Sequence, residues 1–203
     1  MSELFQSMTF EQKVSYLIEN LKSLPNELVE EGIDVLAKAG ETEYAVVLAR
    51  DRGMIDRAIS ILIEAGDYLW AALISRNAGR PEQSERIYRD GLKYYIDREM
   101  FGRAISAASA LGLPAEEIDG IRMAGLIHDL GKISVPAEIL SKPSRLSDLE
   151  FSLIRIHPEA GYEILKDIEF PWPIARIVLE HHERMDGSGY PRGLTGEQLL
   201  PAS

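Results

Sequence analysis

All four histidines of this sequence lie between residues 128 and 182, and the first of them is followed directly by an aspartate. Imidazole and carboxylate groups are the side chains that divalent iron, manganese and zinc accept together as ligands. A carboxylate can bridge two such ions, and a pair of ions can activate water and hold a phosphoryl group. The sequence therefore predicts a site for one or two divalent ions. Its candidate ligands are His128, Asp129, His157, His181 and His182.

Two further side chains near the histidines are candidates for binding a phosphate or shaping a pocket. Lys132, one turn beyond His128, could neutralise phosphate charge, and Asp186 lies in the glycine-rich stretch DGSGYP. Each residue alone has a simpler explanation, since most lysines are solvated and an aspartate beside glycines usually belongs to a turn. A single histidine at a helix end is likewise more often a capping or core residue. Only the combination of these residues favours a metal site.

The His–Asp pair is expected at the end of a helix. Pro114 suits the first turn of that helix, and the two glutamates that follow it favour the positive helix end. Gly131 is expected to end the helix. An apolar face at helical spacing lies between these limits and consists of Ile118, Ile121, Ala124 and Ile127.

The remaining histidines are expected at the ends of two later helices. Pro136 and Pro143 indicate a loop, and SDLE at 147–150 is a capping-box signature that opens the next helix. His157 precedes a proline and is expected at a helix start. A turn at 171–173 is followed by an apolar face made of Ile174, Ile177, Val178 and His181. No convincing strand pattern is present, so the predicted fold class is all-α.

The first half of the sequence has a regular spacing of 13 residues between the glycines Gly40, Gly53, Gly66 and Gly79. Five positions after each glycine is a small residue: Ala45, Ala58, Ala71 and Ser84. This pattern predicts short helices, each closed by a glycine in the left-handed conformation. Pairs of such helices would stack as a short solenoid, an interaction scaffold for a protein partner. An irregular helical bundle is the alternative.

Composition limits the partners of the protein. The formal net charge of −11 argues against binding to a nucleic-acid polymer or an anionic membrane. Cysteine is absent, which excludes disulfides and thiolate metal sites and fits a reducing cytoplasm. No segment reaches the roughly 18 uninterrupted apolar residues of a membrane span, and the polar N-terminus is unlike a signal peptide. We therefore expect a cytoplasmic protein.

Three long stretches of the second half occur in an order and spacing typical of one family. They are LGLPAEEIDGIRMAGLIHDLGKISVPAEILSKP, HPEAGYEIL and FPWPIARIVLEHHERMDGSGYPRGLTGEQ. With them, residues 111–203 resemble the HD-GYP family of cyclic di-GMP phosphodiesterases, a branch of the HD metal-dependent phosphohydrolases. His128 and Asp129 match the HD pair, and Gly189, Tyr190 and Pro191 match the GYP signature. The expected organisation is thus a helical-repeat region at 1–110 and a partial HD-GYP domain at 111–203.

The resemblance implies roles for individual residues. Asp129 would bridge the ions and His128 would bind the first, while the later histidines would bind the second, or a third where one is present. Lys132 would contact the phosphate, and residues 189–191, with Asp186, would border the substrate or face a partner. The implied ions are iron or manganese rather than zinc. The implied reaction is hydrolysis of a cyclic dinucleotide to the linear form.

The sequence departs from the family pattern at two places. The family has a further histidine before the HD motif, and counting back from Pro114 places Ile96 there, with no simple substitute nearby. The family also continues into a helix with a closing metal-binding aspartate, whereas this sequence ends in LLPAS at 199–203. The first ion would keep only His128 and Asp129, although such sites usually need three protein ligands. The missing helices should also leave the face of Ile174 and Ile177 partly uncovered.

These departures leave two main functions open. The first is a phosphodiesterase whose activity is weak or absent because two metal ligands are missing. The second is a non-catalytic module that binds a nucleotide or a protein through the remaining pocket or the helical repeat. A homo-oligomer that caps the partial domain is compatible with both. The number of metal ligands is the feature that separates the two functions.

Overall fold

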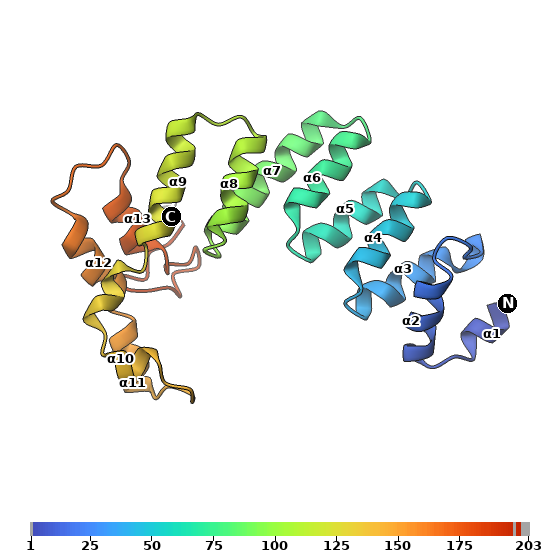
Figure 1. The fold of residues 1–203 in the computed structure, drawn as a ribbon, viewed down its shortest axis with the longest axis horizontal. Helices are drawn as coiled ribbons and strands as arrows, with labels where there is room; N and C mark the ends of the chain where they lie inside the picture. The colour runs from blue at the N-terminus through green and yellow to red at the C-terminus, as the bar shows by residue number, and fades with distance from the viewer. Residues whose placement is uncertain (1, 197, 200–203) are drawn as a thin grey trace. The chain divides into compact units, whose positions relative to one another are not determined.

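The computed structural model describes residues 2–196, 198 and 199, and the segment 200–203, where the sequence analysis expects truncation, lies outside them. The described chain consists of helices joined by loops (Figure 1), and its only extended pairing is an isolated bridge between Asp186 and Thr195. This confirms the all-α class. None of the described helices has the length and apolar character needed to cross a membrane.

The chain forms two compact units, residues 1–91 and 92–203, and the division falls within one long helix, α7. The functional boundary expected at residue 110 stays a prediction. The first unit and this helix contain α1 (Ser2–Gln6), α2 (Phe10–Glu19), η1 (Asn26–Leu28), α3 (Val29–Lys38), α4 (Thr42–Asp51), α5 (Ile55–Glu64), α6 (Tyr68–Asn77) and α7 (Pro81–Ile96). Within the first unit, α2 packs against α3, α3 against α4, α4 against α5, and α5 against α6.

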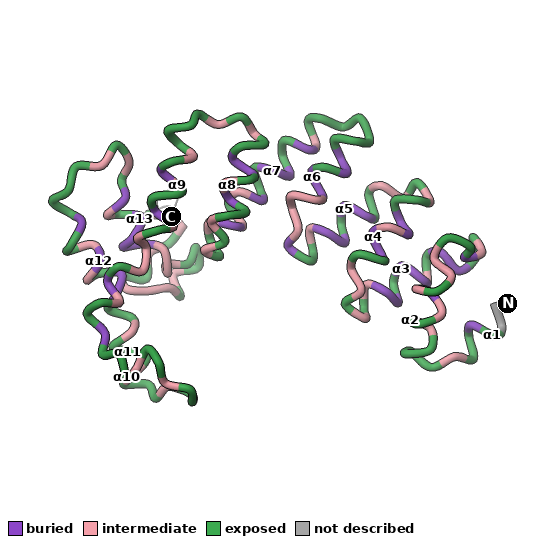
Figure 2. The backbone as a smooth tube through the Cα atoms, in the orientation of Figure 1, coloured by how far each residue is buried: buried purple, intermediate pink, exposed green. Residues whose placement is uncertain are grey.

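The helices α3 to α6 end at the glycines that the sequence analysis identified. Gly40, Gly53, Gly66 and Gly79 have φ angles of 79°, 75°, 77° and 76°, a left-handed conformation that is costly for residues with a Cβ. Five positions after each, Ala45, Ala58, Ala71 and Ser84 are buried. Figure 2 shows buried segments, in purple, along the helices of this region. The predicted helix ends are therefore confirmed, and the small residues allow neighbouring helices to approach closely.

The second unit contains the helices that carry the histidines. They are α8 (Phe101–Ala110), α9 (Ala115–Ile127), η2 (Leu130–Ser134), α10 (Ala137–Leu140), α11 (Asp148–Ile154), α12 (His157–Leu165) and α13 (Ile174–Glu180). The predicted capping box is present, because Ser147 and Glu150 exchange side-chain and backbone hydrogen bonds. The loop expected between Pro136 and Pro143 was only partly right. It contains the short helix α10, which Pro136 precedes as N-cap.

A small apolar core holds α9, α12 and α13 together. Its buried members are Ala124, Leu165, Ile174, Ile177 and Val178, with Ile127, Phe170, Trp172 and Ala175 packed around them. The expectation that Ile174 and Ile177 are partly uncovered was wrong, because α9 and α12 pack against α13 and bury both side chains. The exposed apolar side chains of this unit lie elsewhere, for example at Ile133, which is 80% exposed.

The segment after the His–Asp pair makes backbone contact with α12. A Cβ atom on Gly131 would lie 1.8 Å from the carbonyl oxygen of His157 and 2.5 Å from the amide nitrogen of Gly161. No larger residue fits at this position, since the nearest atoms are backbone and cannot move aside. The contact fixes η2, and with it Asp129 and Lys132, against the start of α12.

We predict that Gly131→Ala lowers the unfolding free energy by about 3 kcal/mol, because the added methyl group meets immovable backbone. The matched control is Gly102→Ala in α8, where a Cβ meets nothing within 4 Å. The control should leave the unfolding free energy unchanged or raise it by up to about 1 kcal/mol. Urea unfolding followed by circular dichroism measures both. Equal stability of the two variants would contradict the close contact.

Candidate metal centre

Three of the histidine rings are held in the same way, at the ends of three different helices. The Nδ1 atoms of His128, His157 and His181 lie 2.9, 2.7 and 2.7 Å from the carbonyl oxygens of the residues three positions earlier, Gly125, Ile154 and Val178. A carbonyl oxygen only accepts, so each Nδ1 carries the hydrogen and donates it. Each Nε2 atom of a neutral ring therefore presents a lone pair, as in histidines that bind metal ions.

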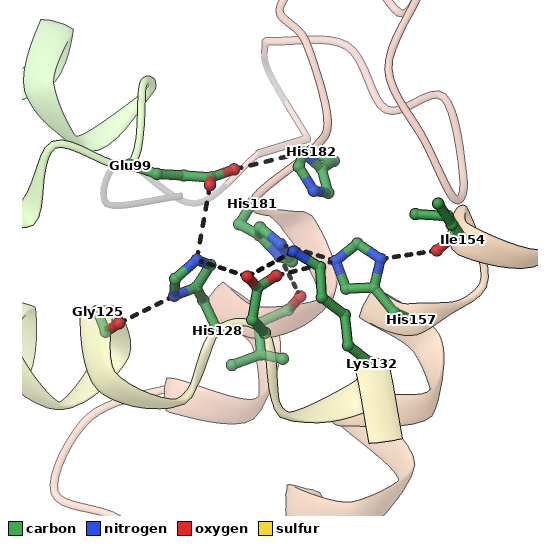
Figure 3. A network of polar contacts seen from close by, with 10 residues as sticks. Glu99, Gly125, His128, Lys132, Ile154, His157, His181 and His182 are labelled. Atoms are coloured by element: carbon green, nitrogen blue, oxygen red, sulfur yellow. Dashed lines mark hydrogen bonds and ion pairs between the residues drawn. The ribbon is translucent and has the colours of Figure 1, made fainter. Parts of the chain in front are cut away.

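The lone pairs of His157 and His181 point at each other. Their Nε2 atoms are 3.2 Å apart, and ligand atoms of His157, His181 and His182 all lie within 4.8 Å of one another. Figure 3 shows these rings around a common space. Two facing lone pairs repel unless a proton or a metal ion lies between them. His157 is fully buried, which makes the unpaired arrangement costly and the site suited to a cation.

Asp129 lies between the first histidine and this group. Its Oδ2 atom is 3.5 Å from Nε2 of His128, and its Oδ1 atom is 3.5 Å from Nε2 of His157. Oδ1 is buried and has no hydrogen-bond partner among the described residues. Such an orphaned acceptor is rare in proteins, and its chemistry fits a position beside a bound cation. The carboxylate thus faces both parts of the site, as a bridging ligand would.

Lys132 keeps Asp129 charged. Its Nζ atom donates a 2.5 Å hydrogen bond to Oδ2 of Asp129. Burial favours the neutral carboxyl, but the Lys132 hydrogen bond and the His128 charge outweigh it and lower the pKa of Asp129. The carboxylate is therefore ionised at neutral pH, which is the form that binds metal ions.

Burial also determines the charge of three histidines. It lowers the pKa of His157 and His182, and it lowers the pKa of His181 to about 4 with the help of the neighbouring His182 charge. These rings are neutral at pH 7, the form required of a metal ligand. The pKa of His128 is raised instead, chiefly by its contact with a glutamate that faces its Nε2 atom.

That glutamate is Glu99, which the sequence analysis did not identify. Its Oε2 atom lies 3.5 Å from Nε2 of His128 and its Oε1 atom 3.4 Å from Nδ1 of His182 (Figure 3). The contact with His128 lowers the pKa of Glu99 to about 2, despite partial burial. Glu99 lies three residues after Ile96. Ile96 is the last residue of α7, and it is the position at which the sequence analysis expects the histidine of the family pattern.

The loop that carries the GYP residues 189–191, here called the GYP loop, contacts the histidine cluster through Tyr190. The ring of Tyr190 stacks on that of His182 with centroids 4.7 Å apart, and the Arg155 guanidinium lies 4.9 Å from the Tyr190 ring. Asp186 behaves as a turn residue, because its Oδ1 accepts hydrogen bonds from the backbone and hydroxyl of Ser188. None of the contacts described for Asp186 joins it to a histidine.

The conformation of this loop depends on a close approach and on one carboxylate. A Cβ on Gly189 would lie 2.4 Å from the amide nitrogen of Arg184, so only glycine fits there. The Glu183 carboxylate accepts hydrogen bonds from the amides of Arg192 and Leu194, at 2.6 and 2.8 Å. These contacts tie Pro191 and its neighbours to the residue directly after His182.

A cavity of about 650 Å³ lies beside the centre, within the second unit. His181 borders it from the side of the histidine cluster, and Lys93, Arg98 and Arg184 add positive charge to its wall. Asp97, Glu183 and Asp186 also line it, so the wall carries both signs of charge. A space of this size can hold a nucleotide-sized ligand.

Comparison with protein-family models identifies the family of the second half. Residues 72–203, more than half of the chain, match the model for the HD domain. The chain belongs to the HD domain family. HD domains are metal-dependent hydrolases, and the cluster of histidines with Asp129 agrees with that assignment.

The HD domain of this chain is similar to curated HD-GYP phosphodiesterases. A cyclic di-GMP phosphodiesterase response regulator of Xanthomonas campestris is 44% identical over 114 residues, which are 55% of this chain and 30% of that protein. A cyclic di-GMP phosphodiesterase of Pseudomonas aeruginosa is 45% identical over 96 residues, 47% of this chain and 23% of that protein. A 3'3'-cGAMP-specific phosphodiesterase of Vibrio cholerae is 40% identical over 96 residues, 47% and 22% respectively.

The resemblance to HD-GYP phosphodiesterases is thereby confirmed for about half of the chain. The matching segment spans less than a third of the length of each of these relatives. Their activities are therefore properties of longer proteins, and the activity of this HD domain is a separate question.

We predict that Glu183→Gln loosens the GYP loop of the HD domain, because a glutamine amide turns a donor toward one of two backbone N–H groups. The amides of Arg192 and Leu194 should exchange hydrogen at least about 10-fold faster, as the loss of one charge-assisted bond implies. The control is Glu159→Gln, which removes only an exposed contact of 3.9 Å with Arg192. Hydrogen exchange measured by NMR tests this. Equal exchange in both variants would contradict the role of Glu183.

Proposed function

We propose that this HD domain hydrolyses a phosphodiester bond of a cyclic dinucleotide in a metal-dependent reaction. The observation that carries the proposal is the 3.2 Å approach of the His157 and His181 Nε2 atoms, beside the unpaired Oδ1 atom of Asp129. These three acceptor atoms repel one another, and a cation bound among them would remove the repulsion. The activity itself is proposed from the relatives, which act on cyclic di-GMP or on 3'3'-cGAMP.

The residues of the centre fit a divalent metal ion. His128 and Asp129 would hold one ion, and Asp129 with His157, His181 and His182 would hold another. Mixed imidazole and carboxylate donors without thiolate suit iron or manganese, and we propose either of these rather than zinc. When bound, such ions supply an activated water and neutralise the charge of the phosphoryl group.

The protein's own residues prepare the site for an anionic substrate. The Lys132 ammonium, which is partly exposed, already lies beside Asp129 and is placed to contact a phosphate oxygen. Tyr190 stacks on one face of the His182 ring, with Gly189 and Pro191 shaping the loop around it. The neutral rings of His157, His181 and His182 and the ionised Asp129 need no proton transfer before they bind a metal ion, whereas a protonated His128 would first release its Nε2 proton.

The alternative is a binding module without catalysis. It is favoured by Ile96, which stands where the family pattern has a histidine, and this residue also predicts weak turnover. In that case the centre would hold a nucleotide, and the helices α3 to α6 would act as a solenoid for a protein partner, with the GYP loop as a second contact surface. A homo-oligomer is a further arrangement that this surface would support.

We predict manganese- or iron-dependent conversion of cyclic di-GMP to the linear dinucleotide. Asp129→Asn should reduce the rate by at least about 100-fold, because it removes the charge that faces both parts of the centre. The matched control is Asp119→Asn on α9, an exposed aspartate paired with Arg122. Chromatography of the products, with cyclic di-GMP and 3'3'-cGAMP compared as substrates, measures the rate.

The outcomes separate the two functions. A metal-dependent rate that the control keeps and Asp129→Asn loses supports the phosphodiesterase. Saturable binding of the cyclic dinucleotide with no product, at metal concentrations that fill the centre, would instead support the binding module.

A further inference from the structure

Glu99 occupies a position that the rest of the chain fills with glycine. At Gly40, Gly53, Gly66, Gly79 and Gly112 a helix ends in the left-handed conformation, with φ between 70° and 79°. Glu99 has a φ of 58° and is the only residue other than glycine with a positive φ in the part of the chain that the structure describes. It also lies 13 residues before Gly112, the spacing of the other helix-ending glycines.

The hydrogen bonds at Glu99 are those of the glycine positions. The amide of Gly53 donates to the carbonyl of Arg50, and the next amide, of Met54, donates to Ala49. The amide of Glu99 donates in the same way to Ile96, and that of Met100 to Tyr95. A glutamate is therefore held where the chain otherwise uses glycine, at a cost to stability. Such an outlier points to a role for the side chain.

The side chain of Glu99 reaches the incomplete part of the metal centre. Its Oε2 atom faces the same Nε2 atom of His128 that Oδ2 of Asp129 faces, each at 3.5 Å. The other ring nitrogen of His128 is held by the carbonyl of Gly125. Two carboxylates, one from the loop after α7 and one from the end of α9, thus lie 3.5 Å from the same nitrogen of His128.

The other carboxylate oxygen of Glu99, Oε1, contacts a second histidine, His182. His128, His157 and His181 each use Nδ1 against a backbone carbonyl, whereas Nδ1 of His182 faces Oε1 of Glu99 at 3.4 Å. A carboxylate behind a histidine orients the ring and leaves its Nε2 atom for a metal ion.

We infer that Glu99 is the third protein ligand of the ion held by His128 and Asp129, and that it also orients His182. The carboxylate takes the place of the histidine that the family pattern has at Ile96. This inference rests on the metal centre of the proposed function, and it does not require that the centre hydrolyses a cyclic dinucleotide.

The test uses Mn²⁺ and three variants of the full chain. Glu99→Gln removes the charge and keeps the size of the side chain. Glu99→Gly removes the ligand and restores the residue that the backbone conformation favours. The control is Glu138→Gln, an exposed glutamate on α10. Bound manganese is counted by mass spectrometry after equilibrium dialysis, electron paramagnetic resonance reports coupling between neighbouring ions, and thermal unfolding is followed without metal.

We expect two manganese ions in the wild type and in Glu138→Gln, with the resonance signal of a coupled pair. Glu99→Gln and Glu99→Gly should bind the weaker ion at least about 10-fold less tightly and lose the coupled signal. Metal-free Glu99→Gly should melt at the same temperature as the wild type or higher, which a merely structural role would not produce.

Two results would overturn the inference in distinguishable ways. Unchanged manganese content and affinity in Glu99→Gln, with metal bound by the wild type, would show that Glu99 is only an ion-pair partner of His128 and would leave the metal centre standing. A wild type that binds no manganese would remove both the inference and the metal centre of the proposed function.

Discussion

The centre depends on the hydrogen bonds that tie histidine Nδ1 atoms to backbone carbonyls at helix ends. Each bond fixes the tautomer of its ring and directs the Nε2 lone pair away from the helix. Because α9, α12 and α13 pack around one apolar core, the three helix ends meet. The packing of the apolar core thereby brings the Nε2 atoms of His157 and His181 to within 3.2 Å of each other. Their lone pairs repel unless a cation lies between them.

A second constraint places the aspartate among these rings. The contact of Gly131 with the backbone of His157 and Gly161 leaves no space for a side chain. It therefore holds the turn after Asp129 at a fixed distance from the start of α12. The two oxygens of Asp129 can then face His128 and His157 at equal distances of 3.5 Å. Helix packing alone would not set this distance so closely.

Much of the site was predictable from the sequence, because its chemistry depends on residue type and local helix signals. The helix start at His157, the capping box at Ser147 and the glycine-terminated helices of the first half follow from short-range rules that the structure obeys. The expectation that Gly131 closes its helix was wrong, because α9 ends at Ile127 and Gly131 lies within η2 without a positive φ. The burial of Ile177 was not predictable, since it depends on how α9 and α12 pack against α13. Glu99 was not predictable from the family pattern, because that pattern has a histidine at the position of Ile96 and no ligand at position 99. The 13-residue spacing counted back from Gly112 leads to it, as a glutamate where glycine is expected.

The hydrogen bond between Lys132 and Asp129 has a consequence for assembly of the protein. The Lys132 ammonium group is a counterion for the Asp129 carboxylate. The charge of Asp129 is therefore balanced by a side chain of the same protein, whereas small zinc modules depend on their ion for folding. An ion held by Asp129 would take the place of the ammonium beside that carboxylate. Metal loading would thus release Lys132 at the moment when a charged group for the substrate is first needed.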